Sequence, residues 1–341
     1  MSCAHFGLTS EGFGVNMIEL SNSNGLVVKC IPYGCCITNI MLPSPQGPAD
    51  IVLGFDELSG YEADKTGQGA FIGRYANRIK DASVRIAGKD YALMKNEGES
   101  YLHGLLQHRL FTVAGSCEKF VKFETVSKDG EEGFPGELEI TVTYSLDDDN
   151  RLTMDYFART NADTHINLTN HAYFDLACGR DETIEKHLLR IASDAFLETS
   201  EDLIPTGKKI GVEGTPFDFR EKKPIGRDIG ANDINLKIGR GYDHCFVLNG
   251  KPGELSLAAE AFSPDGARSM KVFTTQPAIQ LYTGNFLDGT ITGKGRRFNR
   301  RSAFCLETQH YPDTPHHPDF PSTLLKPGEE FHETTALEFS F

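Results

Sequence analysis

The sequence contains no tryptophan, almost no helical periodicity and no apolar stretch approaching 18 residues. A membrane-spanning helix needs about 20 consecutive apolar residues, so we expect no helical membrane anchor. The first residues also lack a basic region followed by an apolar run, which is the pattern of a secretory signal. We therefore expect a cytoplasmic protein.

Motifs for several cofactors and metals are also missing. No phosphate-binding P-loop, GxSxG elbow or HExxH pair occurs, and the glycines at 67, 69 and 73 have the wrong last spacing for a dinucleotide site. The eight cysteines include no CxxC pair. His310, His316 and His317 lie close together but lack a matching cysteine or carboxylate spacing for a metal. We expect no metal and no cofactor.

Acidic residues outnumber basic ones by 48 to 34, for a net charge of -14. Such a chain is a poor match for nucleic acid or for an anionic membrane surface. A small molecule is the better expectation for a partner. No exposed apolar stripe points to a protein partner, so a monomer is the default.

Alternation of apolar and polar residues dominates the chain. It is clearest from Glu137 to Leu146 and resumes at Leu152, on the other side of an Asp-rich break, which predicts two antiparallel strands. Short helices are expected only at 56–61 and 181–186. Further strands are predicted at 13–20, 26–31, 164–170, 245–248, 255–262, 270–274, 278–282 and 331–341, with a hairpin at 83–93. No linker interrupts this pattern, so we predict an all-β fold in which residues 1–341 form one large antiparallel β-sandwich domain.

The segment 303–313 carries the strongest chemical signal. Ala303 to Leu306 are apolar and predict a buried strand that ends at Glu307, ahead of a proline-rich loop. A carboxylate fixed by a strand suits a general base. Position alone, however, more often marks a solvated surface acid.

Other polar residues stand at predicted strand ends and turns, and together they suit a sugar. Amide, guanidinium, imidazole and carboxylate groups can satisfy several hydroxyls at once, and an unmatched buried polar group costs about 1 to 3 kcal/mol. Any one of them taken alone is as well explained by a structural role. The set comprises Asn77, Arg78, His103, His171, Asp243, Gln280 and Glu307.

Five segments together resemble the aldose 1-epimerase, or galactose mutarotase, family. They are GRYANRI at 73–79, NLTNHAYF at 167–174, GYDH at 241–244, LYTGN at 281–285 and CLETQHYPD at 305–313. The resemblance runs from about Phe13 to Phe341. It implies the large β-sandwich of that family, which agrees with the alternation.

The resemblance also implies roles for individual residues. Glu307 would be the general base and His171 the general acid. The sugar would be bound by Asn77, Arg78, His103, Tyr173, Asp243 and Gln280. The chain departs from the family's usual residues at Leu105, Phe111, Asp175 and His316, which bears on substrate preference more than on chemistry.

Anomer exchange in a free aldose requires a base at the C1 hydroxyl and an acid at the ring oxygen, so that the ring opens, rotates about C1–C2 and closes. It needs neither metal nor redox cofactor. For these roles Glu307 must be ionised while His171 is charged, and we expect each group to favour the charged form of the other.

Three other functions stay open on sequence alone. A glycoside hydrolase could use Glu307 with Asp243 as its carboxylate pair. A hexose-6-phosphate epimerase would need a phosphate clamp, for which the dense basic cluster at Arg296, Arg297, Arg300 and Arg301 is the candidate. A binding protein could keep the pocket without turnover.

Overall fold

The computed structural model describes residues 3–341, and nearly all regular structure in them is antiparallel β. The predicted domain also includes residues 1 and 2, which lie outside the described residues. The longest sheet runs in the order β11 (Thr112–Ser116), β12 (Phe120–Ser127), β13 (Leu138–Leu146), β14 (Arg151–Thr160), β29 (Phe331–Ser340), β23 (Ser269–Thr274), β22 (Ser256–Phe262), β17 (Leu188–Ile191) and β20 (Lys223–Pro224).

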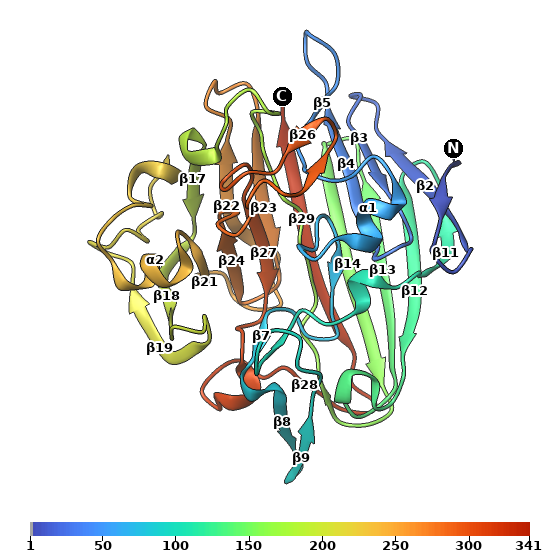
Figure 1. Cartoon of the computed structure of the whole chain (residues 1–341), viewed down its shortest axis with the longest axis vertical. Coiled ribbons are helices and arrows are strands. Elements are labelled where there is room, and N and C mark those ends of the chain that lie inside the picture. The colour runs from blue at the N-terminus through green and yellow to red at the C-terminus, as the bar shows by residue number, and fades with distance from the viewer. Residues whose placement is uncertain (1–2) are drawn as a thin grey trace.

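Two five-stranded sheets accompany it. The first contains β1 (Cys3–Leu8), β2 (Gly14–Ser21), β3 (Val27–Cys30), β4 (Ile37–Leu42) and β5 (Ala49–Asp50). The second runs β19 (Pro205–Gly211), β18 (Ser193–Thr199), β21 (Asp243–Leu248), β24 (Ala278–Tyr282) and β27 (Cys305–Gln309). In Figure 1 the first lies on the side of the N-terminus and β18, β19 and β21 lie on the opposite side.

Short two-stranded ladders lie outside these sheets. They pair β7 (Arg78–Ile79) with β10 (Tyr101–Leu102), β6 (Phe71–Ile72) with β16 (Thr169–Asn170), β15 (Thr164–His165) with β28 (Leu324–Leu325), β25 (Thr292–Gly293) with β26 (Arg296–Arg297), and β8 (Ser83–Ile86) with β9 (Lys89–Ala92). The β8–β9 hairpin projects from the lower edge of the molecule in Figure 1.

Apolar faces of all three large sheets meet in one core. The alternation seen in the sequence of β13 becomes a strict alternation of buried and more exposed side chains, because successive side chains of a strand point to opposite faces. The shared core includes Val28, Ile40, Val142, Leu281, Leu306 and Leu337. This supports the prediction of a single domain, which stays a prediction.

The all-β antiparallel prediction is confirmed, with three local corrections. The predicted strand 164–170 is split into β15 and β16, which pair with different partners. The helix predicted at 181–186 is reduced to a 3₁₀ turn, Ile184–Lys186. The helix predicted at 56–61 is present as α1 (Leu58–Ala63), and α2 (Ile234–Gly239) was not predicted. With six residues, α2 is too short to show helical periodicity in sequence.

No helix in the described part of the chain is both long and apolar enough to cross a membrane.

Candidate active site

One face of the second five-stranded sheet carries Asp243, Gln280 and Glu307. Gln280 on β24 is directly paired with Glu307 on β27, and with Cys245 two residues after Asp243 on β21. Directly paired residues present their side chains on the same face, and so do residues two apart on a strand. Glu307 lies inside β27 and not at its end as predicted. It is only 2% exposed, which excludes a solvated surface acid.

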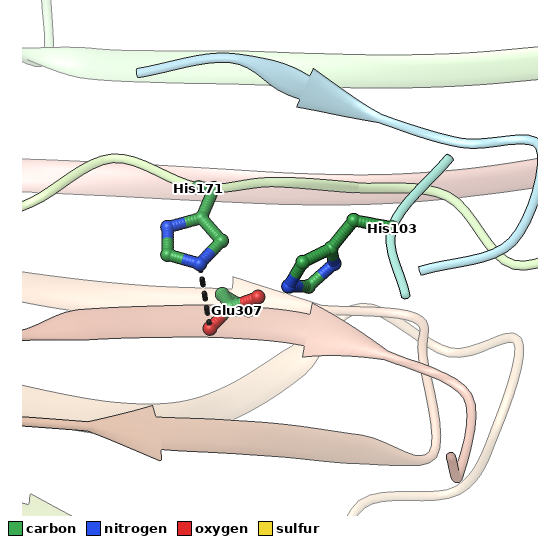
Figure 2. A group of neighbouring side chains, drawn as sticks. All are labelled: His103, His171 and Glu307. Carbon is green, nitrogen blue, oxygen red and sulfur yellow. Dashed lines mark ion pairs between the residues drawn. The ribbon is translucent and has the colours of Figure 1, made fainter. Parts of the chain in front are cut away.

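His171 is placed opposite Glu307 by the segment that follows β16. The amide of His171 donates to the carbonyl of Ala70 at 2.9 Å. Three residues later, Phe174 forms a two-way backbone bridge with Phe304, just before β27. The histidine therefore lies across from the glutamate, and His171 Nε2 and Glu307 Oε1 are 3.6 Å apart (Figure 2).

Asn77, Arg78 and His103 are brought together by the short β7–β10 ladder. Leu102 pairs with Arg78, so His103 follows directly beside them. The backbone N–H of Asn77 donates to His103 Nδ1 at 3.1 Å. The side-chain oxygen of Asn77 accepts from the backbone N–H of Arg78 at 2.8 Å. Figure 2 shows the His103 ring directed toward Glu307 and His171.

These groups face a cavity of about 1280 Å³. Every predicted site residue except Gln280 lines it. Gln280 lies behind Asp243 and donates from Nε2 to Asp243 Oδ1 at 2.6 Å. Tyr173 donates its hydroxyl to the carbonyl of Thr66, and its ring stacks on His171 at 5.0 Å between centroids. Direct sugar contacts stay a prediction for these two residues, as they do for the other lining residues.

Burial dominates the electrostatics of the Glu307–His171 pair. It raises the pKa of Glu307 well above the usual range, Asp243 raises it further, and Arg78 partly opposes both. Burial also lowers the pKa of His171 to about 4. Both shifts favour the uncharged forms, because burial takes the two groups out of water. That each group favours the charged form of the other stays a prediction.

Arg78 is a buried cation of the site. Its Nε and Nη2 donate to the two carboxylate oxygens of Glu97 at 2.6 and 2.7 Å. Burial lowers the pKa of Arg78, but Asp243, Glu97 and Glu307 more than offset this, so the pKa is raised. Burial raises the pKa of Asp243, although Arg78 and Gln280 oppose that shift. The two hydrogen bonds to Glu97 hold the guanidinium of Arg78 in one orientation.

The tautomer of His103 follows from its backbone contact. An amide N–H can only donate, so His103 Nδ1 accepts and the ring proton of the neutral form is on Nε2. Burial lowers the pKa of His103 well below its usual value, with His171 and Arg78 adding to the shift. Ligand atoms of His103, His171 and Glu307 lie within 4.8 Å of one another. Because His103 Nε2 carries a proton, it offers a hydrogen bond there and no lone pair for a metal ion.

The other clusters singled out in the sequence reach this cavity only in part. His316 and His317 line it together with Asp313, which both contact, whereas His310 contacts Glu333 outside the lining. None of the four arginines of the basic cluster lines the cavity. They contact Asp175, Gly289, Arg240 and Glu185. That cluster cannot serve as the phosphate clamp of a hexose-6-phosphate epimerase.

The departures from the family pattern are spread over the molecule. Phe111 packs in the core against Phe71, and Leu105 is exposed outside the cavity lining. Asp175 is buried and pairs with Arg296 at 2.8 Å. Only His316 lines the cavity. Any effect on the sugar site is therefore expected to come from His316.

Several lining residues were missed by the sequence reasoning. Glu97 follows no recognisable motif, and its role depends on the fold of the 96–100 turn against β7. Tyr282 and Phe286 stack on each other beside the site at 6.2 Å, and Arg240 lies over the Phe286 ring. Tyr282 stands in a segment quoted for the resemblance, which was the one signal available. Residues 200–206 form another part of the wall.

Histidines buried in neutral form make a prediction about stability. Burial lowers the pKa of His244 to about 3, while an unfolded histidine titrates near 6.5. Between these values the unfolded chain binds a proton that the folded chain does not, so the free energy of unfolding falls as the pH drops below about 6.5. At pH 5, His244 lowers the free energy of unfolding by about 2 kcal/mol relative to neutral pH. In urea denaturation at pH 7, 6 and 5, His244→Gln should flatten this slope.

The control for this experiment is His332→Gln, which replaces an exposed histidine and should leave the slope unchanged. An unchanged slope in His244→Gln would contradict the prediction.

Comparison with known proteins agrees with this fold. The family model of aldose 1-epimerase matches residues 16–338. Galactose mutarotase from Bos taurus is 43% identical over 99% of this chain and 98% of its own, and the aldose 1-epimerase of Escherichia coli K12 is 35% identical over 97% of both. The solved structure of an aldose epimerase homologue from C. elegans has a TM-score of 0.88 at 29% identity, covering 96% of this chain and 99% of its own. The chain therefore belongs to the aldose 1-epimerase family, a family of isomerases.

Proposed function

We propose that this protein interconverts the α and β anomers of free hexoses such as galactose and glucose, with Glu307 as general base and His171 as general acid. The observation that carries the proposal is the buried pair itself. Glu307 Oε1 and His171 Nε2 lie 3.6 Å apart and face the same cavity as Arg78, His103 and Asp243. An acid and a base on either side of one bond are what ring opening requires.

The reaction balances without a further reactant. Glu307 takes the proton of the C1 hydroxyl while His171 Nε2 gives a proton to the ring oxygen and the bond from C1 to the ring oxygen breaks. After rotation about C1–C2, Glu307 returns its proton to the aldehyde oxygen and His171 takes back the proton of the chain hydroxyl as the ring closes. Positioned acid and base groups each contribute roughly 10² to 10⁴ in rate.

The opposite pKa shifts of the pair are compatible with this cycle. Protonated Glu307 with neutral His171 carries the same number of protons as ionised Glu307 with charged His171. The neutral arrangement is the one present after ring opening, and it is the arrangement that burial favours. Burial therefore stabilises the neutral pair, from which the ring closes. It leaves the ionised pair, from which the ring opens, at higher free energy and so more reactive.

The remaining polar groups suit the sugar hydroxyls. His103 Nε2 is a donor, Asp243 an acceptor and Arg78 a donor whose fork is set by Glu97. Loss of one charged hydrogen-bonding partner is worth roughly 10- to 100-fold in binding. Asp243→Ala should therefore raise KM by that factor with a smaller change in kcat. The exposed Asp90→Ala, which breaks an ion pair with Arg85 outside the cavity, should change neither.

A fall in kcat with KM unchanged in Asp243→Ala would place Asp243 in the chemistry and not in binding.

Polarimetry tests the proposed activity directly. Freshly dissolved α-D-galactose and α-D-glucose are followed toward rotational equilibrium with and without the protein, at a pH where the spontaneous reaction is slow. Acceleration without any added cofactor is expected and would rank the two sugars. Folded protein that binds sugar without acceleration would instead indicate a binding protein, and release of a chromogenic aglycone would indicate a hydrolase using Glu307 and Asp243.

The location of the protein, its class of partner and its oligomeric state are proposals as well. We expect a cytoplasmic location, which the seven free cysteines of the described chain support, since thiols persist in reducing compartments. The net charge of -14 supports a small-molecule partner over nucleic acid or an anionic membrane. A monomer stays the default expectation.

A further inference from the structure

His171 has one side-chain partner at its second ring nitrogen, and it is a thiol. Cys305 Sγ lies 3.5 Å from His171 Nδ1. Cys305 is fully buried and stands on β27 two residues before Glu307, so both side chains lie on the same face of the strand. One strand thus presents a group to each nitrogen of the imidazole: Cys305 to Nδ1 and Glu307 to Nε2.

The chemistry of the proposed function, on which this inference rests, fixes what Nδ1 must do. Nε2 faces Glu307 and the cavity, so Nε2 is the atom that gives up and regains the proton. The imidazole must remain neutral after it has given that proton away. Its remaining proton is then on Nδ1, because a neutral imidazole carries one proton.

We propose that Cys305 is a positioning residue: its sulfur accepts the Nδ1–H of His171, holds the ring in the Nδ1–H tautomer and leaves the Nε2 lone pair free for the reaction. The ring is also held by stacking on Tyr173 and by the edge of His103. Those contacts fix its plane but do not select a tautomer. The hydrogen bond at Nδ1 makes that selection.

A thiol suits this role better than a carboxylate would. Elsewhere in the chain, the Nδ1 of His316 meets Asp313 at 2.6 Å, and that hydrogen bond raises the pKa of His316. A charged acceptor at His171 would likewise hold the proton that must be given away. Sulfur is a weak acceptor. Burial raises the pKa of the Cys305 thiol well above its usual value, with Glu307 and Asp243 adding to the shift, so it brings no charge.

The tautomer can be read from the wild-type protein by NMR of ¹⁵N-labelled histidine at pH 7. The ring signals of His171 are assigned from their loss in His171→Asn. His171 is expected in the Nδ1–H form and His103 in the Nε2–H form, so His103 serves as an internal reference of the opposite type. An Nε2–H form of His171 would mean that the thiol donates, and it would overturn the proposal. Since this readout does not depend on turnover, it separates failure of this inference from failure of the proposed function.

Variants test the same role by kinetics. Cys305→Ala should lower kcat about tenfold, the value of one neutral hydrogen bond, with KM within about twofold. Cys305→Ser restores an acceptor and should recover most of the loss. The matched control is Cys30→Ala, which removes another fully buried thiol and its hydrogen bond, to the carbonyl of Ile18, away from the cavity. Equal kcat values in Cys305→Ala and Cys30→Ala would overturn the proposal.

Discussion

Replacing Glu307 with glutamine is expected to reduce kcat for anomer exchange at least a hundredfold while sugar binding stays nearly normal. The amide keeps the size of the side chain, but it cannot take the proton of the C1 hydroxyl, and a positioned base contributes roughly 10² to 10⁴ in rate. Polarimetry gives kcat, and calorimetric titration with galactose gives the affinity.

The same variant should be more stable than the parent protein at pH 7. Burial and Asp243 raise the folded-state pKa of Glu307, so the folded state disfavours the ionised carboxylate at any pH above the unfolded value. Glutamine removes that penalty. The control for the kcat measurement is Glu333→Gln, which should keep the kcat of the parent protein. Glu333 also lies beside a histidine, His310, at 3.2 Å, but outside the cavity. A nearly normal kcat in Glu307→Gln would remove Glu307 from the mechanism.

Replacing His171 with asparagine is expected to have an effect of the same order. Asparagine fits the space and can hydrogen-bond, but it cannot exchange a proton with the ring oxygen near neutral pH. Since Glu307 and His171 act in one concerted exchange, the double variant should lose little more than either single variant. Polarimetry of the three proteins at equal concentration checks this.

His310→Asn is the matched control, since it replaces a partly buried histidine that contacts a glutamate outside the cavity. Its kcat should equal that of the parent. If His171→Asn kept kcat and lost only affinity, His171 would be a binding residue and the acid would have to be sought elsewhere.

The sequence by itself determined the class of fold. It also predicted which two residues form the catalytic pair. Alternation over Glu137 to Leu146 predicted β13 because the period of two is a local property of a strand that buries one face. Five segments in family order indicated His171 and Glu307 without any knowledge of distance. The lack of helical periodicity predicted the absence of long helices for the same local reason.

Tertiary structure alone decided the environment of each group. The contact of Cys305 with His171 spans 134 positions in sequence, and that of Gln280 with Asp243 spans 37. Burial of Glu307 depends on segments distant in sequence, such as those that carry His171 and Arg78, and so the direction of its pKa shift could not be predicted from a strand position. Local pattern specifies which face a side chain occupies, but only the folded chain specifies what lies opposite it and how much water remains.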